Sequence, residues 1–166
     1  MPRDKKGNLL LGDNMEFWTK PFTPNIVIKA FLYLLKDWEK GINILDDAIA
    51  IDNKNDRLKQ EKTLALHIAL SIRSTTNIIR FSDIMRKIQK TKNELTVSTL
   101  YQDAKNIMRD EIAIAQQDRR LLMMDKQLGY HPEAFCNLYT INDIDHKIKT
   151  MRSELKMILS NFKFER

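Results

Sequence analysis

The chain is poor in the residues that break helices. Four prolines occur in 166 residues, and Pro2, Pro21 and Pro24 all fall at the beginning. The stretch from Asn25 to His131 contains none. Proline in a helix interior costs about 3 kcal/mol, so this long proline-free stretch, rich in Leu, Ile, Ala, Lys and Glu, favours long helices.

Other absences exclude whole classes of protein. The single cysteine, Cys136, excludes a disulfide within the chain and a zinc site with several thiolates. Apolar runs are too short to span a membrane, and no charged-then-apolar signal segment opens the sequence. We expect a soluble chain, cytoplasmic by default, in which Met1 fits either a true start or an internal methionine of a longer protein.

Common catalytic motifs are missing as well. The sequence contains no glycine-rich phosphate loop, no HExxH, no GxSxG and no paired Glu-x-x-His. His146 lies beside two aspartates but one position off an apolar face, which favours a surface residue over a metal ligand. We therefore expect no metal, no cofactor and no catalysis by this chain alone.

Four long helices are predicted from apolar residues spaced three or four apart. Thr23 and Pro24 supply an N-cap and a first helical residue for the first helix, which ends near Asp52. The second covers residues 56–90. The third begins at a cap on Thr96 or Ser98 and reaches residue 128, and the fourth begins after Thr140, with Asp143 completing a capping box.

Short links between long helices predict an all-α fold, an elongated antiparallel bundle of about four helices. The bundle domain covers residues 23–166, and an irregular N-terminal arm covers residues 1–22. Gly129 is expected to end the third helix with a positive φ, and Gly41 to admit a neighbouring backbone.

Polar residues occur on helix faces that we expect to be buried. Buried carboxylates need partners, and antiparallel packing of the second and third helices would supply them from Arg73, Arg80 and His67. We predict a buried polar network with a structural role, made of Arg73, Asn77, Glu111, Asp118 and Asp125. A glycosidase reaction between these carboxylates is a weak alternative, because residues seven apart on a helix stand about 10 Å apart.

Two apolar segments suggest contacts with other proteins. Phe17, Trp18 and Phe22 in the arm form a predicted docking surface. The last helix carries an apolar seam from Ile141 to Phe162, with steps of three and four. That seam either packs along a groove of the bundle or pairs between chains as a homo-oligomer.

The net charge of +6 permits binding to nucleic acid without arguing strongly for it. The positive charge gathers only at residues 80–92, where Arg80, Arg86, Lys87, Lys90 and Lys92 fit a solvated helix end.

Motifs along residues 13–160 resemble the C-terminal helical region of large bacterial glycoside-hydrolase-like proteins. The late motif comprises Glu111, Ala115, Asp125, Leu128, Gly129, Tyr130 and Glu133; earlier ones comprise Ser74, Asn77, Phe81 and Arg86, and Phe17 to Pro24 with Trp38 and Gly41. Gln127 stands where the family pattern has arginine. The resemblance implies a helical accessory domain beside a catalytic barrel, which is absent here, so no catalytic residue carries over.

Three functions are consistent with these observations. The first is a non-catalytic accessory domain that packs on a catalytic domain or partner chain of a carbohydrate-active system. The second is a stand-alone interaction or oligomerisation module. The third is a basic helical protein that binds nucleic acid, for which binding should weaken steeply with salt.

Overall fold

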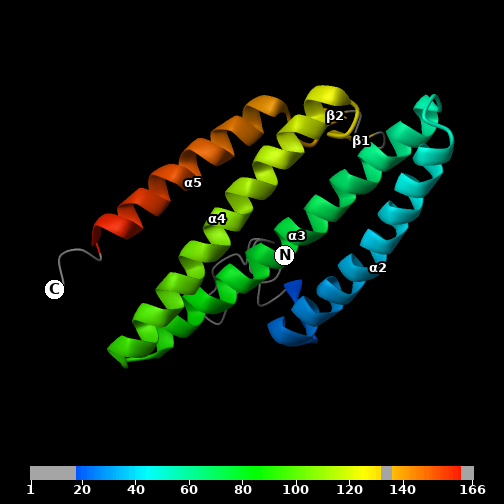
Figure 1. Ribbon diagram of the computed structural model, residues 1–166. Helices are drawn as coiled ribbons and strands as arrows, with labels where there is room; N and C mark the ends of the chain where they lie inside the picture. Colours follow the sequence, from blue (N-terminus) through cyan, green and yellow to red (C-terminus); the bar gives the residue numbers. More distant parts are fainter. Residues whose placement is uncertain (1–17, 132–135, 162–166) are drawn as a thin grey trace.

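A computed structural model describes residues 18–131 and 136–161, with the side chains of all but 130, 131, 136, 137 and 158–161. In this part of the chain four long helices and one short strand pair occur (Figure 1). The helices are α2 (Pro24–Ile51), α3 (Asp56–Lys90), α4 (Glu94–Met124) and α5 (Ile141–Asn161). Strands β1 (Tyr130–His131) and β2 (Cys136–Asn137) pair antiparallel. The predicted all-α fold is confirmed.

Local residues set the ends of α2 and α3 as the sequence predicts. Thr23 is the N-cap of α2 and Pro24 its first residue, although the Thr23 side chain makes no capping hydrogen bond. Asn55 caps α3, where its Oδ1 accepts a hydrogen bond of 3.2 Å from the backbone N–H of Leu58. Both helices have their predicted bounds to within one residue.

The predicted bounds of α4 are wrong at both ends. Its N-cap is Asn93 rather than Thr96 or Ser98, because the Asn93 Oδ1 accepts a 2.9 Å hydrogen bond from the backbone N–H of Thr96. The helix ends at Met124, and Asp125 is its C-cap. The last helix begins as predicted: the Asp143 carboxylate accepts a 2.7 Å hydrogen bond from the Thr140 backbone N–H.

The two glycines singled out in the sequence have other roles than predicted. Gly129 does not adopt a positive φ; instead, a Cβ added there would lie 2.5 Å from the carbonyl oxygen of Tyr139. Glycine is thus required for a close approach between the two sides of the α4–α5 connection. No backbone approaches Gly41, where an added Cβ would meet nothing within 4 Å.

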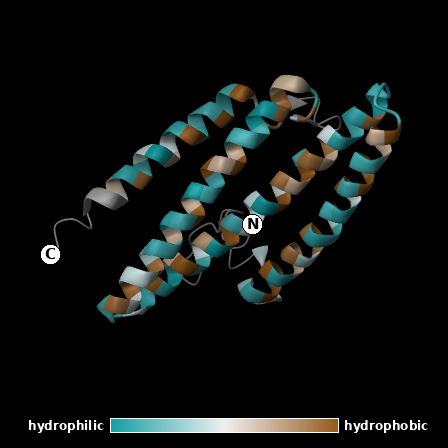
Figure 2. Ribbon diagram, viewed as in Figure 1, coloured by the Kyte–Doolittle hydropathy of each residue, from teal (hydrophilic) through white to brown (hydrophobic). Residues whose placement is uncertain are grey.

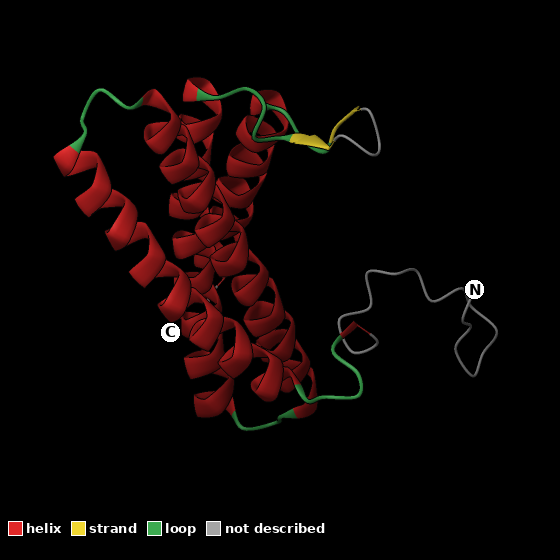
Figure 3. Cartoon of the chain, turned by 90° about the vertical axis from the view of Figure 1, so that its right-hand side faces the viewer, coloured by secondary structure: helices red, strands yellow, loops and turns green. Residues whose placement is uncertain are grey.

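The helices lie in an open row, in the order of the sequence. The main contacts join α2 to α3, α3 to α4 and α4 to α5, so that α2 and α5 stand at opposite ends of the row (Figure 1). Figure 3, turned by 90°, shows the connections at the two ends of the helices. Consequently, α3 and α4 have a neighbour on two sides, whereas α2 and α5 have one.

The core follows from this order. Ile79, only 1% exposed, is among the buried apolar residues of α3, which packs on both α2 and α4. A second cluster joins α4 to α5 through Ile112, Ala115, Leu122, Ile144 and Ile148. The seam that begins at Ile141 therefore packs within the chain along its first turns, and Met151 and Leu155 pack partly against the same cluster. Its end at Phe162 lies outside the described residues.

Helix α2 differs from the others because it is rich in apolar residues but poorly buried. One residue of its 28, Ile42, is buried. Its inner face packs on α3, where the Trp38 indole N–H donates a 2.8 Å hydrogen bond to the Ala65 carbonyl oxygen. Figure 2 shows apolar residues along the whole length of α2. In the described part of the chain, no helix is both long and apolar enough to cross a membrane.

Candidate functional site

A buried carboxylate on α4, Glu111, gathers donors from two other helices. From α3, the Ser74 hydroxyl donates a hydrogen bond of 2.5 Å and the Asn77 amide one of 3.1 Å. From α5, the Lys147 ammonium lies 2.6 Å from the Glu111 carboxylate. This arrangement meets the cost of burying the charge with a cation and two neutral donors, and it ties α3, α4 and α5 together.

The neighbouring carboxylate, Asp110, extends this network toward the surface. The Asn77 amide also donates to Asp110 at 2.9 Å, and the Arg73 guanidinium donates to it at 3.0 Å. Asp110 is about half exposed on its side chain, unlike Glu111. We call these six residues the Glu111 network: Arg73, Ser74, Asn77, Asp110, Glu111 and Lys147.

A second polar cluster lies two turns further along α4, around Asp118. The His67 Nδ1 lies 2.6 Å from one Asp118 oxygen, and the Tyr139 hydroxyl donates a 3.1 Å hydrogen bond to the other. The same hydroxyl lies 3.0 Å from the His67 Nε2. These three residues, the His67 cluster, come from α3, α4 and the segment before α5.

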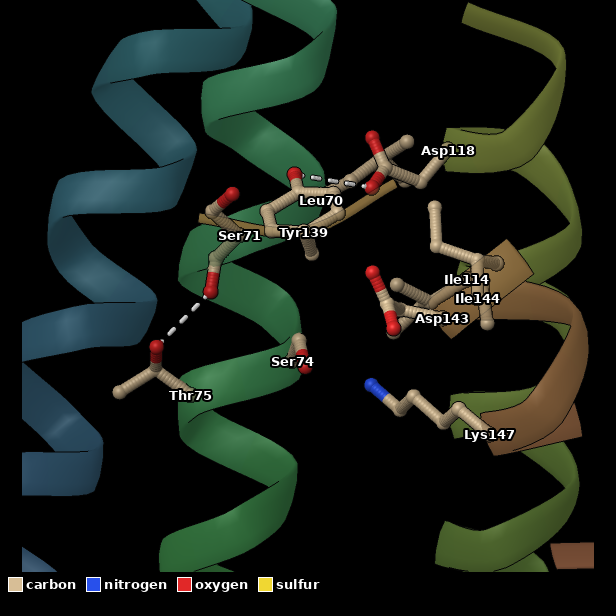
Figure 4. Close-up of a pocket in the computed structure, with 11 residues that line it drawn as sticks. Leu70, Ser71, Ser74, Thr75, Ile114, Asp118, Tyr139, Asp143, Ile144 and Lys147 are labelled. Atoms are coloured by element: carbon tan, nitrogen blue, oxygen red, sulfur yellow. Dashed lines mark hydrogen bonds between the residues drawn. The ribbon is translucent and has the colours of Figure 1, made fainter. Parts of the chain in front are cut away.

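An open cavity of about 380 Å³ separates the Glu111 network from the His67 cluster. Figure 4 shows its polar side chains pointing inward from opposite walls: Ser74 comes from α3, whereas Asp118 and Lys147 come from α4 and α5. Much of the remaining lining is apolar, from residues such as Leu70, Ile114 and Ile144. The cavity exists because α5 packs on α4 and leaves a gap toward α3.

The polar groups around this cavity are paired with one another. Burial, the negative charge of Asp118 and the hydrogen bond to it all raise the pKa of Tyr139 well above its usual range. At neutral pH the phenol therefore stays protonated and donates to Asp118, which makes it a poor general base or nucleophile. Within the described residues, every buried side-chain nitrogen or oxygen has a hydrogen-bond partner.

Metal binding is not indicated by the described residues either. Among them, no group of three His, Cys, Asp or Glu side chains could hold a metal ion. His146 is exposed. The side chains of His131 and Cys136 lie outside those that the structure describes.

The five residues predicted as one polar network fall into three places. Arg73, Asn77 and Glu111 lie together in the Glu111 network, whereas Asp118 belongs to the His67 cluster. Asp125 belongs to neither group, so its predicted place in the network is wrong. It is the C-cap of α4, and its carboxylate accepts a 2.9 Å hydrogen bond from the backbone N–H of Gln127. The predicted partner Arg80 is exposed and belongs to neither group.

Sequence reasoning missed Asp110, Tyr139 and Lys147 as members of these groups. A signal existed for Lys147, which lies three residues after Ile144 and thus beside the apolar seam of α5. Tyr139 lies in a loop, where helical spacing says nothing about its contacts.

The basic cluster near the end of α3 is partly neutralised. Asp83 lies 2.6 Å from the Arg86 guanidinium and 2.7 Å from the Lys87 ammonium. Burial alone would raise the pKa of Asp83, but the hydrogen bonds and charges of Lys87 and Arg86 outweigh it and hold that pKa below its usual range. Two of the five cations at residues 80–92, Arg86 and Lys87, therefore form ion pairs with the buried Asp83.

The outward face of α2 carries several exposed apolar side chains. Their spacings of three, four, seven and eleven residues are close to whole numbers of helical turns, and we call them the outer stripe: Ile26, Ala30, Tyr33, Ile44 and Ile51. Tyr33, Ile44 and Ile51 are 71%, 67% and 89% exposed. Isolated exposed apolar residues are common, but four large exposed side chains on one face of a helix are a mark of a contact surface. Asp37 and Lys40 lie on the same face, between Tyr33 and Ile44.

The predicted docking residues lie at the beginning of the same helix. Trp18 and Phe22 are 49% and 58% exposed, and the Trp18 ring lies 6.2 Å from the ring of Phe31 on α2. Phe17 lies outside the described residues.

Comparisons with known proteins add no relative. The chain matches no protein-family model, and no curated protein or solved structure is similar to it.

Proposed function

We propose that this chain is a non-catalytic helical interaction domain that acts by packing the outer stripe of α2 on a partner protein. The observation that carries the proposal is the contrast between helices: Ile44 and Ile51 of α2 are exposed, whereas polar groups of α3 and α4 are buried and paired. Burying exposed apolar side chains contributes about 25 cal/mol per Å², so such a face favours association.

Crosslinking inside cells tests this proposal. A photoreactive phenylalanine analogue replaces Tyr33 on α2, or Leu95 on α4 as the matched control, because both side chains are strongly exposed. Irradiation in the native host should give a discrete protein adduct from position 33 and none from position 95. The substitution Ile44→Asp, on the same stripe, should abolish the adduct. An adduct that survives this substitution, or an absence of any adduct, contradicts the proposal.

The resemblance to the helical region of glycoside-hydrolase-like proteins supports a more specific form of this proposal. In that form the partner is a catalytic barrel, and this chain buttresses it without contributing to catalysis. Support comes from the order of the sequence motifs alone. Reading the neighbouring gene is the simplest test. We expect it to encode a barrel with paired catalytic carboxylates, and we expect that barrel to co-purify with this chain by a contact at position 33.

A further inference from the structure

The outer stripe of α2 has a two-fold pattern along its length. Ile26 and Ile51 stand at equal distances from one point near the middle of the helix, and Tyr33 and Ile44 stand at equal distances from the same point. Turning the helix end over end therefore places each of these apolar side chains where another one was. A second α2 laid antiparallel would bring Ile26 beside Ile51, and Tyr33 beside Ile44, of the other copy.

The charges beside the stripe follow the same pattern. Lys29 and Asp47 are both exposed, and they share one flank because about five turns separate them. Antiparallel pairing sets Lys29 of each copy near Asp47 of the other, whereas parallel pairing leaves them about five turns apart. Asp37 and Lys40, which lie 2.6 Å apart, stand at equal distances from the same central point. That ion pair can therefore be exchanged between the two copies.

An apolar groove lies along the other flank of the stripe, away from Lys29 and Asp47. This groove of about 570 Å³ runs between α2 and α3, and its walls are mainly apolar: Leu34, Trp38, Gly41, Leu45, Leu64 and Ile68. An added Cβ at Gly41 would meet nothing within 4 Å, and Ala30 is also small and exposed. Small residues between large ones let two helix backbones come close.

We propose that α2 pairs antiparallel with α2 of a second copy of this chain, about a two-fold axis at the middle of the helix. The inference rests on the proposed function and names a second copy of the chain, rather than a catalytic barrel, as the partner of the outer stripe. Self-complementarity is what a two-fold interface requires, because the same patch must match itself. Neither an unrelated protein nor the segment before Trp18 requires apolar positions and charges that match when the helix is reversed. The dimer contact thus lies on α2 and not on the α5 seam, whose first turns pack against α4.

Sedimentation equilibrium of the full chain, over a range of concentrations, tests the pairing. The wild-type protein should show a reversible monomer–dimer equilibrium. Ile44→Asp should weaken the dimer by about tenfold or more, because it places a charge in an apolar contact. Leu95→Asp introduces the same charge at an exposed leucine of α4 and should leave the dimer unchanged. Circular dichroism should show that both variants keep the wild-type helicity.

A charge exchange tests the antiparallel arrangement specifically. Lys29→Asp and Asp47→Lys should each weaken self-association, because each sets like charges together in the antiparallel pair. Mixing the two variants should restore dimers, since every contact between positions 29 and 47 then joins opposite charges. Parallel pairing predicts no such recovery on mixing.

A monomeric wild-type protein overturns the proposed pairing, and so does a dimer that is insensitive to Ile44→Asp or a mixture that shows no recovery. An adduct between position 33 and a different protein in the cells, with a monomer in solution, overturns the pairing but leaves the proposed function intact. The absence of both the dimer and any adduct overturns the two together.

Discussion

Helix α2 is the more apolar of two neighbouring helices, yet Ile42 is its one buried residue. Helix α3 is far more polar, and its buried residues include His67, Asn77 and Asp83. The difference follows from position: α3 lies between two helices, whereas α2 has a neighbour on one side. Place in the row, rather than hydrophobicity, decides which side chains lose water, and the polar ones are tolerated because each has a partner.

Matched isoleucine substitutions should show the largest difference between the two helices. Ile79→Ala on α3 removes a side chain that is 1% exposed and leaves a cavity, so we expect a loss of about 3 to 4 kcal/mol in the free energy of unfolding. Ile44→Ala on α2, which is 67% exposed, should cost less than about 0.5 kcal/mol. Urea denaturation at a dilution that keeps the chain monomeric measures both. Equal losses would contradict the comparison.

The contribution of the buried polar groups to stability depends on Glu111. Glu111→Ala should lower the free energy of unfolding by about 2 to 3 kcal/mol, because it leaves Ser74, Asn77 and Lys147 without their shared acceptor. Asp103→Ala, at an exposed position of the same helix, is the control and should change it by less than about 0.5 kcal/mol. If both variants unfold alike, the Glu111 network contributes nothing to stability.

Replacing each of the two glycines with alanine should change the free energy of unfolding in opposite directions. Gly129→Ala brings a Cβ against the Tyr139 carbonyl oxygen, and forcing the connection apart should cost about 1 to 3 kcal/mol. Gly41→Ala has open space within α2 and should stabilise the monomer by up to about 1 kcal/mol, since alanine favours the helix. Thermal melts of both variants decide the signs; destabilisation by both would show that Gly41 is held by a contact.

The smallest expected effect is on the pH dependence of the free energy of unfolding, and it depends on Tyr139. The pKa of Tyr139 is raised on folding, so the folded state keeps a proton that the unfolded state loses above its ordinary pKa near 10. Wild-type stability should therefore decline as pH rises above about 10, and Tyr139→Phe should remove part of that decline. Urea denaturation at pH 8 and pH 11 measures the difference.

The parts of the fold that depend on local chemistry were predictable. Thr23 with Pro24 gives the start of α2, and Thr140 with Asp143 gives the start of α5, because capping involves residues close in sequence. The end of α4 was not predictable in this way. Gly129 reads as a helix stop, but its actual constraint is the Tyr139 carbonyl oxygen, a contact made only after the chain has turned back.

The same distinction, between what local sequence shows and what distant contacts decide, applies to the polar groups. The pairing of α3 with α4 could be expected from Asn77 and Glu111, since polar residues on buried faces need each other. Their division into two groups could not, because it depends on Lys147 and Tyr139 from the last third of the chain. The exposed state of the outer stripe was also hidden, since spacing alone cannot say on how many sides a helix has neighbours.

The order of the helices in the row has a consequence for synthesis. Each helix packs mainly on the one that precedes it, so α2 and α3 can pair while α4 and α5 are still being made on the ribosome. Contacts between segments adjacent in sequence need little loop closure and form quickly. The first helix can therefore pack before the last one has been made. Helix α2, which leaves the ribosome first, is also the helix whose outward apolar face stays exposed.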